Sequence, residues 1–117
     1  MKIIITYDAD NLNGEEAINY NQIKKMIVKA LLRLQSTNIV NPMRTTIISD
    51  IPDNRLDRMT RALFSGSQNL RNRNIEFKYV IAPILTNDNG IPLVIMPPIS
   101  LPGFNAILEE AMRELNL

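Results

Sequence analysis

The sequence predicts a small α/β domain in which helices pack on a mixed sheet in the order β-α-β-α-β-β-α, with a ferredoxin-like arrangement as the alternative. Three observations lead to this prediction. Apolar runs of strand length alternate with segments of helical periodicity, no internal repeat is present, and 117 residues with 45% hydrophobic content are enough for one compact domain, residues 1–117, with its own core. Alternating strands and helices favour parallel pairing, followed here by one antiparallel hairpin.

The first half of the chain is predicted to form a strand, a helix and a second strand. Lys2 to Asp8 suits a buried strand, because its three consecutive isoleucines show no polar alternation. Asn13 is the expected N-cap of the helix, with Glu16 completing a capping box. The apolar positions of this helix recur at helical spacing: Ile23, Ile27, Ala30, Leu31 and Leu34. A second strand is expected over roughly Arg44 to Ser49, which is rich in Thr and Ile.

The second half is predicted to contain a helix, a hairpin and a last helix. Asp53 is the expected N-cap of the second helix, and Gly66 is its expected end. A third strand begins at Ile75, and the turn signal TNDNG leads to a return strand over Ile91 to Ile99, whose prolines favour a sheet edge. The last helix is predicted from an apolar stripe made by Phe104, Ile107, Leu108, Ala111, Met112 and Leu115.

The composition excludes several kinds of chemistry. With neither cysteine nor histidine, the chain has no disulfide, no structural zinc site, no Cys nucleophile and no His acid-base catalyst. No apolar run approaches the length that spans a membrane, so we expect no membrane association and a cytoplasmic location. The preference for Ile and Asn is typical of an AT-rich genome, such as that of a phage or mobile element, and the location is then the host cytoplasm.

Acidic residues follow the first two predicted strands. Asp8 and Asp10 end the first strand, and Asp50 and Asp53 end the second. If these strands are parallel neighbours, the four carboxylates converge at one edge of the sheet, where open α/β folds bind their ligands. Such a cluster suits Mg²⁺ or Mn²⁺, which take oxygen ligands, waters and substrate phosphate. The alternative is that the acids shape loops and cap helices.

The stretches ITYDADN and IISDIPD resemble the motifs of NYN/PIN-like nucleases, whose first strand ends in an acid followed shortly by Asn and whose later strand ends in Ser-Asp-x-x-Asp. The resemblance implies that Asp8, Asp50 and Asp53 are catalytic metal ligands, with Asn11 and Ser49 in support, and that the protein is such a nuclease or an inactivated relative. Tyr7-Asp8 is also similar to the end of the first strand in the small ferredoxin-like nucleases of CRISPR adaptation systems.

The basic residues gather in the middle of the chain. The formal net charge is only +1, yet 11 of the 13 Lys and Arg residues lie between Lys24 and Lys78. We expect a subset of them to contact nucleic-acid phosphates: Lys25, Lys29, Arg33, Arg55, Arg58, Arg61, Arg71 and Arg73. The alternative is that they form solvated helix faces.

The segment Ile91–Gly103 mixes apolar residues with four prolines, so it needs a cover. Either the last helix covers it, or it is the interface of a homo-oligomer or of a protein partner. Two functions remain open: a Mg²⁺-dependent nucleic-acid phosphodiesterase, or a non-enzymatic binding or assembly module that acts through its basic face or this proline-rich edge. A nucleotide-binding domain built on a Gly-rich phosphate loop is disfavoured, because no such loop follows either of the first two strands.

Overall fold

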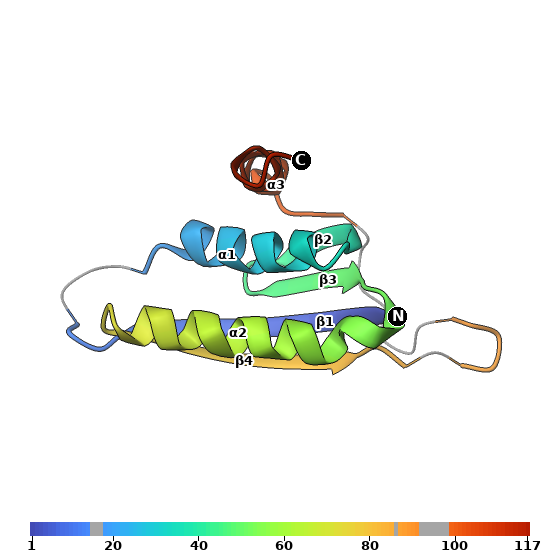
Figure 1. Ribbon diagram of the computed structural model, residues 1–117, viewed down its shortest axis with the longest axis horizontal. Coiled ribbons are helices and arrows are strands. Elements are labelled where there is room, and N and C mark those ends of the chain that lie inside the picture. Colours follow the sequence, from blue (N-terminus) through green and yellow to red (C-terminus); the bar gives the residue numbers. More distant parts are fainter. Residues whose placement is uncertain (15–17, 86, 92–98) are drawn as a thin grey trace.

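The structure is a computed structural model that describes residues 1–14, 18–85, 87–91 and 99–117. Its chain order is β-α-β-β-α-β-α, and the first six elements have the connectivity of the ferredoxin-like arrangement (Figure 1). The elements are β1 (Lys2–Asn11), α1 (Tyr20–Arg33), β2 (Thr37–Met43), β3 (Thr46–Asp50), a short 3-10 turn (Asp53–Arg55), α2 (Leu56–Arg71), β4 (Ile75–Pro83) and α3 (Phe104–Glu114).

The described strands form a four-stranded sheet in the order β2-β3-β1-β4, and all three ladders are antiparallel. The α/β class is therefore confirmed, whereas the expected parallel pairing of the first two strands is wrong. The reason is β2, which the sequence did not indicate because Asn38, Asn41 and Pro42 have low strand propensity. These residues are tolerated because β2 is an irregular edge strand with register shifts. One additional strand before β3 reverses the direction in which β3 runs.

One face of the sheet is packed against α1 and α2. Along β1, Ile3, Ile5, Tyr7 and Ala9 are buried, and the alternate residues point to the opposite face. The buried residues join Ile27 and Leu31 of α1 and Met59 and Leu63 of α2 in one core cluster. Phe77 and Tyr79 of β4 lie on the same face, because they pair with Ala9 and Tyr7 of β1.

Both long helices differ from the predicted bounds at one end. Helix α1 begins at Tyr20, and its N-cap is Asn19, whose side chain accepts a hydrogen bond from the backbone N–H of Gln22, instead of Asn13. Helix α2 continues past Gly66 as far as Arg71. Gly66 is the point where α2 approaches α1, because a Cβ there would lie 2.8 Å from the sulfur of Met26. The glycine therefore permits close helix packing and does not end the helix.

Helix α3 confirms the predicted last helix and crosses α1 on the outside of the molecule (Figure 1). Lys25 lies 3.1 Å from Glu110 and 3.2 Å from Glu114, and Lys29 lies 3.1 Å from Glu114. The chain reaches α3 along the edge of β2, where the N–H of Leu101 donates to the carbonyl of Asn41. These contacts fasten α3 to α1 and β2.

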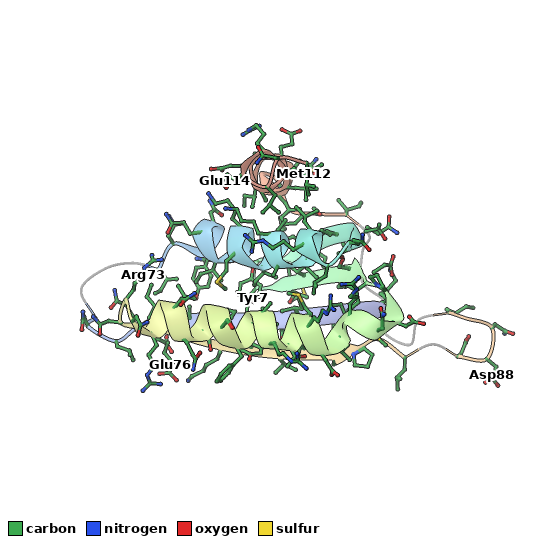
Figure 2. The ribbon with its side chains drawn as sticks, in the orientation of Figure 1. Tyr7, Arg73, Glu76, Asp88, Met112 and Glu114 are labelled. Atoms are coloured by element: carbon green, nitrogen blue, oxygen red, sulfur yellow. The ribbon has the colours of Figure 1, made fainter. Side chains whose placement is uncertain are left out.

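The predicted turn at TNDNG is present over residues 87–91, where Asn87 accepts hydrogen bonds from the N–H groups of Asn89 and Ile91. Asp88 lies at the tip of this loop, away from the sheet (Figure 2). The expected return strand falls largely on residues 92–98, which lie outside the described residues. Among the described helices, none has the length and apolar character needed to cross a membrane.

Candidate functional site

The antiparallel ladder between β1 and β3 separates the two pairs of acids. Asp50 pairs with Lys2 at the start of β1, whereas Asp8 lies six residues further along the same strand. At about 3.3 Å per residue, the two carboxylates are roughly 20 Å apart along the sheet. The convergence that parallel strands would produce therefore does not occur within one chain. In the part of the chain that the structure describes, no three acidic side chains are grouped closely enough to hold a metal ion.

At the Asp50 end, the polar side chains are paired with one another. The Nζ of Lys2 lies 3.1 Å from Asp50, and Asn38 donates to the same carboxylate at 2.9 Å. Burial tends to raise the pKa of Asp50, but these hydrogen bonds and the lysine charge outweigh it, so the pKa is lowered. Ser49 is fully buried and bonds with Ser36 and the carbonyl of Thr37.

Asp53 does not cap a helix, contrary to the sequence prediction. No side-chain hydrogen bond caps the 3-10 turn that begins at Asp53, and the Asp53 carboxylate instead accepts a hydrogen bond of 2.8 Å from the amino group of Met1. This bond lowers the pKa of Asp53. The carboxylates of Asp50 and Asp53 are thus already neutralised by cations of their own chain.

At the other end of β1, Asp8 is held by Tyr20, the first residue of α1. The Tyr20 hydroxyl donates to Oδ1 of Asp8 at 2.8 Å, and the backbone N–H of Ala9 donates to the same oxygen at 2.9 Å. These two hydrogen bonds, the tyrosine's first, lower the pKa of Asp8. The same bond raises the pKa of Tyr20, because it stabilises the protonated phenol.

The other two predicted site residues near Asp8 are also placed on β1. Asp10 is exposed on the same face as Asp8 and lies opposite Glu76 of β4. Asn11 ends the strand, and its side-chain oxygen accepts a hydrogen bond of 2.9 Å from the N–H of Asn13. Asp10 and Asn11 therefore remain near Asp8, while Ser49, Asp50 and Asp53 do not.

The hairpin turn between β2 and β3 brings Arg44 to this end of β1. The N–H of Tyr7 donates to the carbonyl of Thr45 at 3.0 Å, and the Tyr7 hydroxyl donates to the carbonyl of Arg44 at 3.2 Å. The guanidinium of Arg44 then lies over the ring of Tyr20, 4.9 Å from its centroid, in a cation–π contact. Arg44 is thereby joined to Asp8 through Tyr20.

Lys24, one turn into α1, is the second cation here and is largely buried. Its side chain is 8% exposed, and it makes no hydrogen bond or ion pair with any described residue. Burial lowers the pKa of Lys24, and the nearby charge of Arg44 lowers it further. The stem of Lys24 is therefore buried, whereas its ammonium is not among the fully buried polar atoms without a partner and lies near the charge of Arg44 at the surface.

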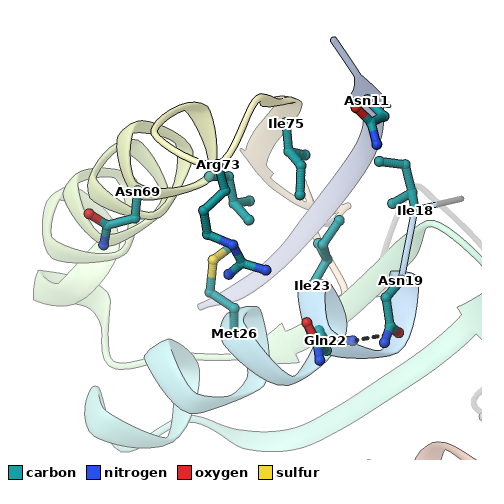
Figure 3. A pocket seen from close by; sticks show the side chains of 10 residues that line it. Asn11, Ile18, Asn19, Gln22, Ile23, Met26, Asn69, Arg73 and Ile75 are labelled. Atoms are coloured by element: carbon teal, nitrogen blue, oxygen red, sulfur yellow. Dashed lines mark hydrogen bonds between the residues drawn. The ribbon is translucent and has the colours of Figure 1, made fainter. Parts of the chain in front are cut away.

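Lys24 and Arg44 line a surface hollow of about 430 Å³ together with Tyr20, Asn19, Asn21 and Ile18. This is the first hollow. A second hollow of about 460 Å³ lies next to it, between the start of α1 and the end of α2 (Figure 3). The two hollows share Ile18 and Asn19. No acidic side chain belongs to the described lining of either hollow, whereas Lys24 and Arg44 line the first hollow and Arg73 lines the second.

Most of the predicted phosphate-contacting residues lie elsewhere. Lys25 and Lys29 are engaged with α3, as described above, and Arg33 is exposed at the far end of α1. Arg58 and Arg61 are exposed on α2, Arg55 is half-buried, and Arg71 lines a groove between α2 and β4. Arg73 alone among the eight lines the second hollow.

Lys24 and Arg44 were absent from the predicted contacts. A signal for Lys24 was present in the sequence, since Lys24, Val28 and Leu31 share the buried face of α1 and a lysine is the exception on such a stripe. Arg44 had no such signal, because its position depends on the β2–β3 turn. The partner surface expected over Ile91–Gly103 stays a prediction, since residues 92–98 lie outside the described part of the chain.

Comparisons with protein-family models, with curated proteins and with solved structures find no match. The fold and the two adjoining hollows therefore define the protein: a small α/β domain of ferredoxin-like connectivity, with Lys24 and Arg44 lining a hollow at one end of its sheet.

Lys24→Met should raise the free energy of unfolding at neutral pH by roughly 0.5–1 kcal/mol, because methionine keeps the apolar stem and removes the unpartnered charge. The folded pKa of Lys24 lies below the ordinary value of 10.5. The destabilisation caused by the Lys24 charge is therefore fully present below the folded pKa and fades as the pH rises through that pKa. The difference in free energy of unfolding between Lys24→Met and wild type should accordingly shrink toward pH 10.5. Urea denaturation at several pH values measures it.

Lys29→Met is the matched control, since it removes a lysine of the same helix that has an acidic partner. Its stability should be unchanged or lower. If Lys24→Met lowers the free energy of unfolding as Lys29→Met does, the ammonium of Lys24 is not an unpartnered, destabilising charge.

Proposed function

We propose that the protein binds nucleic acid by its backbone phosphates at the first hollow, with Lys24 and Arg44 as the phosphate-binding residues. The observation that carries this proposal is the pairing of these two cations, neither of which has an acidic partner among the described residues, in a hollow whose described lining contains no acid. A phosphate oxygen between them would supply the missing negative charge. Arginine suits this role because its planar guanidinium can donate two parallel hydrogen bonds to a phosphate.

The surroundings of the two cations fit a phosphate ligand. Asn19 and Asn21 offer side-chain amides at the rim of the hollow, and amides donate hydrogen bonds to phosphate oxygens. The hydroxyl of Tyr20 donates a hydrogen bond to Asp8, and the guanidinium of Arg44 lies over the ring of Tyr20. This arrangement keeps the guanidinium beside the hollow while the carboxylate is bound to the phenol. Contacts of this kind position a nucleic acid without reading its sequence.

Lys24→Gln and Arg44→Gln should each weaken the binding of a short fluorescein-labelled single-stranded oligonucleotide by about tenfold, as expected for a lost charge-assisted contact. Each should also reduce the slope of log K against log[salt] by about 0.7, because one phosphate contact disappears. Fluorescence anisotropy over a salt series measures both quantities.

Arg33→Gln provides the control, because it removes one positive charge from an exposed site at the far end of the same helix. Its effect on affinity should be less than twofold, because salt screens a charge that lies more than one Debye length, about 8–10 Å, from the first hollow. Equal effects of all three substitutions would show general charge attraction and would overturn the assignment of the first hollow.

A second candidate function adds a metal ion to the same site. Both hydrogen bonds to Asp8 use Oδ1, and the carboxylate is exposed, so Oδ2 is available to Mg²⁺ or Mn²⁺. Mg²⁺ needs only one or two carboxylates when waters and a phosphate complete its coordination. In this version the protein is a metal-dependent phosphodiesterase in which Asp8, with Asp10 in support, holds the ion beside the bound phosphate, and Asp50 and Asp53 have no part.

This candidate predicts that Mn²⁺ raises the melting temperature of the oligonucleotide complex of wild type and of Asp50→Asn, but not of Asp8→Asn. Cleavage of the labelled oligonucleotide, followed by gel electrophoresis, should show the same dependence on Asp8. If Mn²⁺ produces no shift in the wild type, or if Asp50→Asn loses the shift as well, the metal site at Asp8 is wrong while phosphate binding can still hold.

A further inference from the structure

The second hollow differs in chemistry from the first. Its floor is apolar and includes Ile23 and Met26 of α1 and Leu70 of α2, whereas its rim carries the side-chain amides of Gln22 and Asn69. Figure 3 shows the side chain of Arg73 reaching from the turn after α2 toward α1. Arg73 is the single charged residue of the described lining. The hollow therefore suits a largely neutral ligand that has flat apolar faces and polar edges.

A nucleobase has these properties. Its faces stack on apolar side chains and on guanidinium planes, and its edges carry donors and acceptors together. A primary amide offers both a donor and an acceptor, which is why Asn and Gln bind base edges so often. The volume of about 460 Å³ also lies within the range of ligand pockets, roughly 300–1,000 Å³.

The second hollow adjoins the first, so one ligand can place its base in the second hollow and its phosphate in the first. Because the two hollows share Ile18 and Asn19, a ligand with its phosphate at Lys24 and Arg44 can place the attached base in the adjoining second hollow. One nucleotide unit would occupy both. A paired base cannot enter such a hollow, since its edge and both faces are engaged inside the duplex.

We infer that the second hollow binds one unpaired nucleobase, and that the nucleic acid bound by this protein is single-stranded. This inference rests on the proposed phosphate site in the first hollow. The base stacks between the apolar floor and Arg73, and its edge is bound by Gln22 and Asn69. Recognition uses side-chain amides and needs no Gly-rich loop. A free nucleotide would offer the same chemistry, and the experiment below distinguishes it from a strand.

The experiment compares fluorescein-labelled oligothymidylate with an abasic oligonucleotide of equal length, so that the number of phosphates is constant. Wild-type protein should bind oligothymidylate about tenfold more tightly than the abasic strand, the size expected when one stacked base is lost. Gln22→Leu and Asn69→Leu should each lower the affinity for oligothymidylate toward the abasic level and leave the affinity for the abasic strand unchanged. Gln68→Leu, the same change on α2 outside this hollow, should alter neither.

The outcomes separate the two proposals. Equal affinity of wild type for both strands, with a loss for both in Lys24→Gln, would overturn the base site and leave the phosphate site intact. If wild-type protein does not bind the abasic strand, or if Lys24→Gln does not weaken that binding, the phosphate site itself is overturned. A duplex that binds as tightly as oligothymidylate would overturn the requirement for an unpaired base. If thymidine monophosphate competes for the site as strongly as the oligonucleotide does, the occupant is a free nucleotide, and the inference that the protein binds single-stranded nucleic acid is overturned.

Discussion

The antiparallel ladder between β1 and β3 is the constraint on which the whole arrangement depends. It runs from Lys2 opposite Asp50 to Thr6 opposite Thr46, and β1 continues beyond it to Asn11. The ladder places Asp50 beside Lys2 at one end of the sheet. At the other end, the turn that follows β2 must lie against Tyr7, so Arg44 lies over the ring of Tyr20, whose hydroxyl donates to Asp8. The separation of Asp8 from Asp50 and the position of the first hollow both follow from the register of the β1–β3 ladder.

Electrostatic pairing distinguishes the two ends of the sheet. Asp50 and Asp53 have cationic partners within the chain, and Lys25 and Lys29 have acidic ones on α3. Lys24 has none among the described residues, although it is the most buried of the charged side chains. Folding alone gains nothing from an unpartnered ammonium beside Arg44, whereas the proposed phosphate ligand would supply the missing negative charge. This asymmetry is the physical reason for assigning binding to the Lys24 end.

The sequence predicted the elements better than their arrangement. Periodicity identified β1, β4, α3 and the apolar face of α1, because these features depend on local spacing alone. The direction of β3 was mispredicted because one edge strand, Thr37–Met43, contains residues that rarely form strands, and a single missed strand reverses every later neighbour. The sequence indicated Asp8 as a site residue, which stays a prediction, but it gave no indication of Arg44, since the place of Arg44 beside Tyr20 follows from strand direction. Gly66 was read as a helix end because its contact with Met26 is a tertiary feature.

A disulfide across the β1–β3 ladder tests this account most directly, because the chain contains no cysteine of its own. Thr6 and Thr46 face each other at a non-hydrogen-bonded position, where Cα atoms lie about 4.5 Å apart, a separation that a disulfide can bridge. Thr6→Cys combined with Thr46→Cys should oxidise to an intramolecular disulfide, detected by mass spectrometry, whereas Asp8→Cys combined with Asp50→Cys should remain reduced within one chain. A disulfide in the second pair and none in the first would place the acids at one edge of the sheet and contradict the site proposed around Lys24 and Arg44.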